Sequence, residues 1–143
     1  MTTLRLPYYD LSTGAYNGFI QANNALAEGP VDQTIIELIY LRVSQINGCA
    51  FCLEMHSKAL RKAGVAQQKL DALAGWRVSN HFSPAESAAL AWAEDITDIS
   101  TTHAPDSTWQ ALEAHFNARE ISDITFAISL INAFNRLAIG MRM

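Results

Sequence analysis

Apolar residues recur along this chain at the spacing of one helix face. Residues 31–46 carry a wide apolar stripe, because residues three and four apart share one side of a helix; it consists of Ile35, Leu38, Ile39, Val43 and Ile46. Gly29-Pro30 precedes this segment and Asn47-Gly48 follows it, and such pairs interrupt helices. We find no convincing alternation of apolar and polar residues, the pattern of a half-buried strand. The sequence therefore predicts an all-α protein.

We expect one compact domain of about six to seven helices over residues 1–143. A chain of 143 residues is about one domain long, and a domain of this size buries roughly 70% of the surface that its unfolded chain exposes. Ser83-Pro84-Ala85-Glu86 combines a capping serine, a proline at the first helical position and a glutamate that closes a capping box. A loop is expected at residues 101–105. The expected helices cover residues 12–26, 31–46, 49–62, 67–73, 84–98, 106–117 and 122–139.

The charge content predicts an oligomer and excludes some partners. Half of the residues are hydrophobic and 17% are charged, whereas an average soluble domain is about 25% charged. We therefore expect a buried interface in a homo-oligomer. A net charge of −4 argues against binding to nucleic acid or to an anionic membrane, because either partner requires a clustered positive field.

The chain also lacks the features of an exported or membrane-spanning protein. Its first ten residues contain no basic start followed by an apolar run, so no secretory signal is expected. We see no stretch of roughly 18 apolar residues, the length of a membrane span. These observations predict a cytoplasmic protein. In that compartment a Cys-x-x-Cys pair is more often catalytic or metal-binding than a structural disulfide.

Both cysteines of the chain stand in one segment, NGCAFCLEMH, at residues 47–56. If a helix begins at Cys49, then Cys49, Cys52 and His56 lie on one helix face, because they are spaced i, i+3 and i+7. The two thiols also fall in the first turn, where the helix dipole stabilises a thiolate. At such sites the pKa of a cysteine falls from about 8.5 to roughly 3.5–7.5. The segment therefore predicts a reactive thiol.

Two other interpretations of these residues remain open at this point. Cys49 and Cys52 are small enough to be core residues, with His56 satisfied by a carbonyl group. Alternatively, the three side chains supply three of the four ligands of a structural zinc site, with a carboxylate as the fourth. Structural zinc sites usually collect two separate cysteine pairs, and this chain has one pair.

Glu37 is the carboxylate best placed to serve these thiols. It lies twelve residues before Cys49 on the preceding expected helix, among apolar neighbours. An antiparallel turn at Asn47-Gly48 would bring the two helices side by side. A second interpretation is that Glu37 belongs to a solvated polar stripe that also contains Gln33, Tyr40 and Ser44. Glu54 points away from the face shared by Cys52 and His56, and we expect it to be solvated.

Glu37, the Cys49-x-x-Cys52 pair and His56 together resemble the alkylhydroperoxidase D branch of the carboxymuconolactone decarboxylase superfamily. The resemblance covers residues 31–63, and residues 131–136 are similar to the last helix of many members. It implies an all-helical protomer that assembles into trimers or hexamers and acts as a peroxiredoxin-type oxidoreductase. Carried over by position, Cys52 resembles the peroxidatic cysteine, Cys49 the resolving cysteine, and Glu37 and His56 a proton relay. The implied partners are a hydroperoxide substrate and an external dithiol reductant, with no metal or cofactor.

The sequence departs from this pattern at Phe51. The best-characterised members have a second histidine there, immediately before the second cysteine. Phe51 makes the mouth of the site more apolar, which favours an organic hydroperoxide over hydrogen peroxide. The alternatives are a thiol-disulfide oxidoreductase without peroxidase activity and a non-catalytic metal-binding or structural assembly protein. Lactone decarboxylation is disfavoured, because that branch generally lacks the cysteine pair.

The remaining polar residues of interest are expected to be structural. We expect His81 and His103 to be solvated loop residues and His115 to pack within its helix. Three polar residues in the otherwise apolar last helix need hydrogen-bond partners in the fold or across an interface: Asn132, Asn135 and Arg136.

Overall fold

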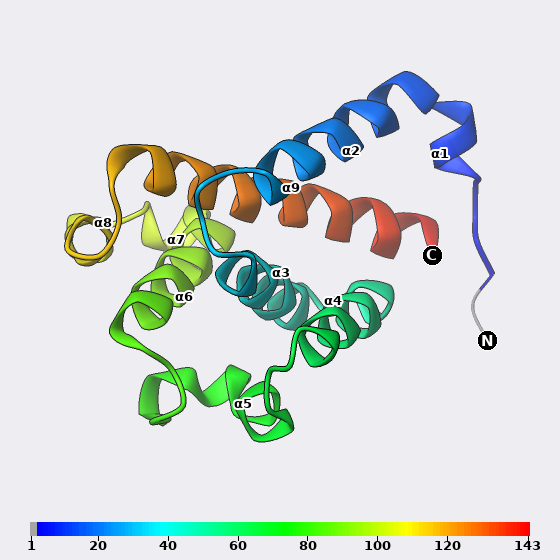
Figure 1. Cartoon of the computed structure of the whole chain (residues 1–143). Helices are drawn as coiled ribbons and strands as arrows, with labels where there is room; N and C mark the ends of the chain where they lie inside the picture. Colours follow the sequence, from blue (N-terminus) through cyan, green and yellow to red (C-terminus); the bar gives the residue numbers. More distant parts are fainter. Residues whose placement is uncertain (1–2) are drawn as a thin grey trace.

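The computed structural model describes residues 3–143, and these residues form helices and connections without a strand. The predicted all-α fold is confirmed (Figure 1). Residues 1 and 2 of the expected domain lie outside the described residues. The helices are α1 (Tyr8–Leu11), α2 (Thr13–Ala27), α3 (Gln33–Asn47), α4 (Ala50–Lys62), α5 (Gln67–Asp71), the 3-10 helix η1 (Leu73–Val78), α6 (Pro84–Thr97), α7 (Ile99–Thr102), α8 (Asp106–Glu113) and α9 (Ala118–Met141).

The expected number of six to seven helices is wrong: residues 3–143 form nine α-helices and one 3-10 helix. The additional elements are α1, η1 and α7, which are four to six residues long. A helix of one or two turns is too short to display a 3.6-residue period. Helix α7 includes two residues of the loop expected at 101–105.

Helix α9 begins at Ala118, four residues earlier than expected. The Asn117 side chain accepts a hydrogen bond from the Glu120 N–H, and the Glu120 side chain accepts one from the Asn117 N–H. This is a capping box, and its pattern, an asparagine followed three residues later by a glutamate, is visible in the sequence. The capping box expected at Ser83 and Glu86 is confirmed.

Helix α9 is the central element of the fold. It contacts α2, α3, α4, α6 and α8, and in Figure 1 it crosses the molecule between α2 and α3. On its buried side lie Ile124, Ile128 and Ile131, which are at most 2% exposed and belong to the main hydrophobic core. A second core cluster, which includes Leu38, Leu60, Leu73 and Leu90, fixes α3 and α4 against η1 and α6.

Helix α9 also corrects the expectation that no segment is apolar enough to span a membrane. Within residues 3–143 it is the one helix that is long and apolar enough, with a mean hydropathy of 1.4 over its most apolar window. A buried core helix has the same length and composition. Here 44% of that window is buried, since five helices surround α9.

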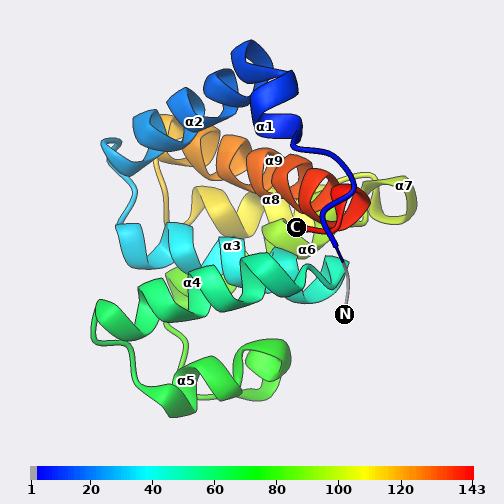
Figure 2. The same cartoon turned by 90° about the vertical axis from the view of Figure 1, so that its right-hand side faces the viewer.

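Helices α3 and α4 form an antiparallel hairpin, and in Figure 2 the two helices run side by side across the picture. Gly48 ends α3 in the left-handed conformation with φ of 72°, which costs glycine little. The Gly48 N–H and the Cys49 N–H both donate to the Ser44 carbonyl oxygen, at 2.9 and 3.0 Å. Chain reversal at this turn brings the start of α4 beside the end of α3.

Candidate active site

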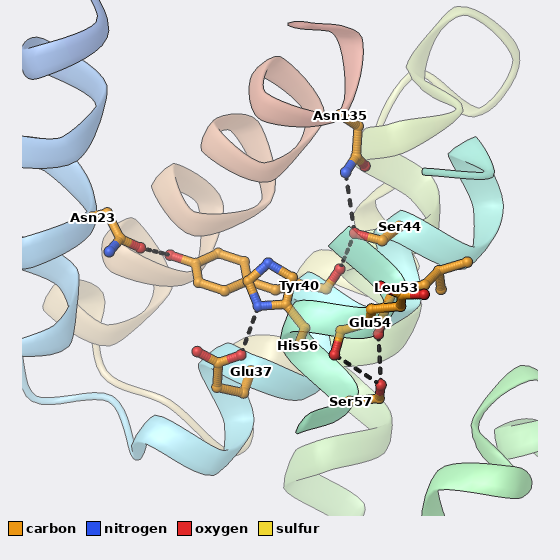
Figure 3. Close-up of polar contacts among 9 residues, drawn as sticks. All are labelled: Asn23, Glu37, Tyr40, Ser44, Leu53, Glu54, His56, Ser57 and Asn135. Carbon is orange, nitrogen blue, oxygen red and sulfur yellow. Dashed lines mark hydrogen bonds and ion pairs between the residues drawn. The ribbon is translucent and has the colours of Figure 1, made fainter. Parts of the chain in front are cut away.

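The hairpin brings Glu37 of α3 and His56 of α4 into direct contact (Figure 3). Glu37 Oε2 lies 2.7 Å from His56 Nδ1. An ionised carboxylate only accepts hydrogen bonds, so toward an ionised Glu37 the donor is the N–H at His56 Nδ1. The side chains of His56 and Glu37 are 9% and 18% exposed. The pair is therefore a largely desolvated carboxylate–imidazole contact, as in sites where a carboxylate orients a histidine.

The other ring nitrogen of His56, Nε2, is buried and makes no hydrogen bond with any of residues 3–143, although buried polar atoms are generally satisfied. The imidazole packs against the Tyr40 ring at a centroid distance of 5.0 Å, and Tyr40 Oη lies 3.5 Å from Asn23 Oδ1. Burial, and then the charge of Glu37, raise the pKa of Tyr40. His56 is thus held in place on two sides while Nε2 remains free to exchange a proton.

Cys49 and Cys52 stand at the amino-terminal end of α4. Cys49 is the residue that precedes the helix, and Cys52 lies in its first turn. Their Sγ atoms are 2.8 Å apart, and both cysteines are free thiols that are 1% and 2% exposed. A disulfide bond between them requires the sulfur atoms to approach to about 2.05 Å. The pair is therefore within reach of a disulfide.

The expectation of a lowered cysteine pKa is wrong for Cys52. Burial, and then the adjacent Cys49, raise the pKa of the Cys52 thiol to about 12, although Asn135 and Ser44 act in the opposite direction. Desolvation disfavours the thiolate more than the first turn of a helix stabilises it. Cys52 is consequently protonated at neutral pH, and a base must remove its proton before it reacts.

One cavity of about 290 Å³ joins these groups. Cys52, His56 and Glu37 line it together with Phe51 and residues of α1, α2 and α9. Phe51 is 41% exposed, so the position of the missing histidine is an apolar part of the cavity wall. The cavity thus places a thiol, an imidazole and a carboxylate along one apolar space.

The polar residues of α9 have hydrogen-bond partners within the fold, which is one of the two arrangements expected from the sequence. Asn47 Nδ2 donates to the side-chain oxygens of Asn132 and Asn135, at 2.9 and 3.0 Å. Asn135 Nδ2 donates to Ser44 Oγ at 3.1 Å, as Figure 3 shows. Arg136 Nη1 contacts Asn132 at 3.3 Å. These bonds fasten the hairpin turn to α9 beside the cysteine pair.

Sequence reasoning missed several residues that build the cavity. Tyr8, Tyr16 and Asn23 come from α1 and α2, and no spacing rule connects them with residues 37–56. Asn135 was singled out for its polarity, but its contact with Cys52 was not foreseen.

The remaining sequence candidates lie outside the site. His81 and His103 are exposed, and neither lines the cavity. His115 is also exposed, because it follows the end of α8 at Glu113, so the expectation that it packs is wrong. Glu54 is exposed as expected. Within residues 3–143 no three His, Cys, Asp or Glu side chains are grouped to hold a metal ion, so the zinc interpretation lacks a ligand set there.

The fold and the site define a helical dithiol protein of the alkylhydroperoxidase D type. The chain belongs to the carboxymuconolactone decarboxylase family, whose model matches residues 14–95. It is 34% identical to the uncharacterized protein YdfG of Bacillus subtilis over 96% of this chain and 93% of that protein.

Two further comparisons place the chain within the family. It is 46% identical to the alkyl hydroperoxide reductase AhpD of a Bradyrhizobium species over 30% of this chain and 24% of that protein. The structure of a protein of unknown function from Agrobacterium tumefaciens, to which an AhpD role in antioxidant defence is attributed, superposes with a TM-score of 0.94. That protein is 38% identical, and the superposition covers 98% of this chain and 96% of the other.

Proposed function

We propose that this protein is a thiol-dependent peroxidase that reduces hydroperoxides through Cys52 and Cys49. The observation that carries the proposal is the Glu37–His56 contact, whose unpartnered Nε2 belongs to a residue lining the same cavity as Cys52. An imidazole oriented by a carboxylate is suited to move a proton near neutral pH. Because the pKa of Cys52 is raised, a proton carrier is needed to form the reactive thiolate.

In the first half of the proposed cycle, His56 Nε2 takes the proton of the Cys52 thiol. The thiolate attacks one peroxide oxygen, the O–O bond breaks, and Cys52 becomes a sulfenic acid. The leaving alkoxide or hydroxide takes the proton back from His56 and departs as an alcohol or water. Glu37 stabilises the transient imidazolium, as a carboxylate does in other catalytic histidine pairs.

In the second half, Cys49 gives up its proton and its sulfur attacks the Cys52 sulfur. The S–O bond breaks, the departing hydroxide takes that proton and leaves as water, and the Cys49–Cys52 disulfide forms, for which the 2.8 Å separation of the thiols is favourable. An external dithiol then reduces the disulfide by exchange and is itself oxidised. The protein thus needs no bound cofactor for turnover.

We further propose that the protein acts in the cytoplasm as a homo-oligomer, a trimer or a hexamer. Its two free, buried thiols suit a reducing compartment. Phe126 is 65% exposed and Trp109 is 40% exposed, and exposed aromatic side chains are typical of subunit contacts. Light scattering coupled to size exclusion measures the subunit number, and a monomer at all concentrations contradicts this proposal.

A second candidate function is thiol-disulfide exchange without peroxidase activity. The 2.8 Å separation of the two sulfur atoms favours it, because dithiol-disulfide cycling requires only a closely spaced pair of thiols. Under this proposal the dithiol only cycles against other thiols and disulfides.

The deciding experiment treats the reduced protein with tert-butyl hydroperoxide and maps its sulfur atoms by mass spectrometry. We expect the wild type to consume peroxide and form the Cys49–Cys52 disulfide, and Cys49→Ser to stop at a sulfenic acid on Cys52 that dimedone traps. Cys52→Ser should consume none. If the wild type consumes no peroxide but exchanges with dithiols, the second candidate is correct.

Glu37→Gln tests the relay in the same assay. The variant keeps the size of the side chain and loses its charge, so the rate of peroxide consumption should fall by about 10²-fold. Glu54→Gln is the matched control, since Glu54 is exposed on the same hairpin, and its rate should be unchanged. Equal rates for the two variants would remove Glu37 from the mechanism.

A further inference from the structure

We infer that peroxide and reductant reach the dithiol through two separate openings, with the reductant attacking Cys49 from a groove that Cys52 does not line. The inference rests on the proposed function and extends it to the site of reduction. The groove measures about 380 Å³ and is lined by Gly48, Cys49, Ala50, Ile139 and Arg142, among others. Cys52 and His56 line the cavity described above, and Cys49 does not. The two cysteines therefore line different spaces although their sulfur atoms are 2.8 Å apart.

Three residues that line both the cavity and the groove form the wall between them. Phe51 and Ala138 line both the cavity and the groove, and so does Met143. Phe51 belongs to the first turn of α4 and Ala138 to α9, so the wall between the openings joins the helix of the dithiol to the central helix of the fold. Because Cys49 is 1% exposed, an attacking thiol must enter the groove to reach its sulfur.

Thiol-disulfide exchange proceeds by attack of a thiolate on one sulfur while the other leaves. A thiolate in the groove bonds to Cys49 Sγ, the Cys49–Cys52 bond breaks, and Cys52 departs with the electron pair. The second thiol of the reductant, once deprotonated, then attacks the reductant's own sulfur in the mixed disulfide. Cys49 leaves as a thiolate and takes up a proton. The reductant loses two electrons, and both cysteines return to the reduced state.

The surroundings of the dithiol favour this direction of attack. Arg142 lines the groove, and Arg5 Nη1 donates to the Gly140 carbonyl oxygen near the same end of α9, at 3.2 Å. The positive charge of Arg142 at this opening attracts an anionic thiolate.

Two bulky substitutions on α4 test the inference, one in each opening. Ala50 lines the groove but not the cavity, Met55 lines the cavity but not the groove, and both residues are exposed. The disulfide is formed with diamide and its reduction by dithiothreitol is timed; separately, the reduced protein is mixed with tert-butyl hydroperoxide. Ala50→Trp should slow reduction about tenfold or more and leave peroxide consumption unchanged. Met55→Trp should slow peroxide consumption and leave reduction unchanged.

The inference is wrong if Ala50→Trp leaves the reduction rate unchanged or if Met55→Trp slows it. Because diamide forms the disulfide without peroxide, the reduction measurement remains valid even if the wild type consumes no peroxide, so failure of the proposed function is seen separately. A second measurement needs no variant: the wild-type disulfide is treated with 2-mercaptoethanol, quenched with acid and mapped. A mixed disulfide on Cys49 supports the inference, and one on Cys52 overturns it.

Discussion

Replacing Asn135 by alanine tests how much the polar contact between α9 and the hairpin turn contributes to stability. Asn135 is fully buried, and its side chain joins Asn47 at 3.0 Å and Ser44 at 3.1 Å. Neither partner is stranded by the change, because Asn47 keeps Asn132 at 2.9 Å and Ser44 keeps the Tyr40 carbonyl at 2.7 Å. Two lost hydrogen bonds cost about 1 kcal/mol each. The space left by the amide adds about 1 kcal/mol, so Asn135→Ala should cost about 3 kcal/mol.

Urea unfolding measures this cost, with the wild type and the variant at the same protein concentration because subunit association would stabilise both. Ser129→Ala is the control on the same helix. Ser129 is exposed and its hydroxyl donates to the Thr125 carbonyl oxygen, so the control should change stability by less than about 0.5 kcal/mol. A cost below about 1 kcal/mol for Asn135→Ala would refute the reasoning, since it falls short of the two hydrogen bonds.

Asn135→Ala should affect chemistry as well as stability. Burial, and then Cys49, raise the pKa of Cys52 to about 12, and the hydrogen bond from Asn135 acts in the opposite direction. Loss of that bond should raise the pKa further and slow alkylation of Cys52 by iodoacetamide at fixed pH. An unchanged alkylation rate in the folded variant would show that the amide does not act on the thiol.

Other perturbations have calculable outcomes. Burial raises the pKa of Glu94, but hydrogen bonds from Trp76 and two arginines outweigh it and lower the pKa below its ordinary value. Its stabilisation is therefore present above the unfolded value near 4.5 and is lost as the pH falls through the folded value. Glu94→Gln should cost about 1–3 kcal/mol in urea at pH 7, with the difference shrinking below pH 4.5; a constant difference contradicts the linkage. Ser83→Ala removes half of a capping box and should cost about 1 kcal/mol, read from the shift in urea midpoint. Gly48→Ala meets open space but keeps a positive φ, so it should cost about 1–2 kcal/mol from backbone strain alone, and an unchanged midpoint would show that the turn relaxes.

The sequence predicted the elements whose information is local. The apolar stripe of residues 31–46 and the Asn47-Gly48 break predict α3, the turn and the hairpin with α4, because periodicity and a left-handed cap act within a few residues. The same holds for the Ser83 capping box. Helix α1 could not be predicted in this way, since four residues carry no period.

The properties of the site that depend on tertiary packing were not predictable. The spacing of Cys52 indicated a helix terminus and hence a lowered pKa, but the contribution that dominates is burial beneath other helices, which spacing does not record. For Glu37, the residues alone left a solvated stripe and a functional contact equally open. Only the packing of α3 on α4 distinguishes them, by placing the carboxylate 2.7 Å from His56.

The hairpin of α3 and α4 supplies the four side chains of the proposed redox cycle, all within residues 37–56, whereas much of the cavity wall comes from α1, α2 and α9. The reacting groups and much of the wall are thus encoded in different stretches of the gene. Mutations in α1 and α2 can diversify the molecules that enter without touching the reacting atoms. A laboratory evolution library restricted to those helices would explore new substrates while preserving the redox centre.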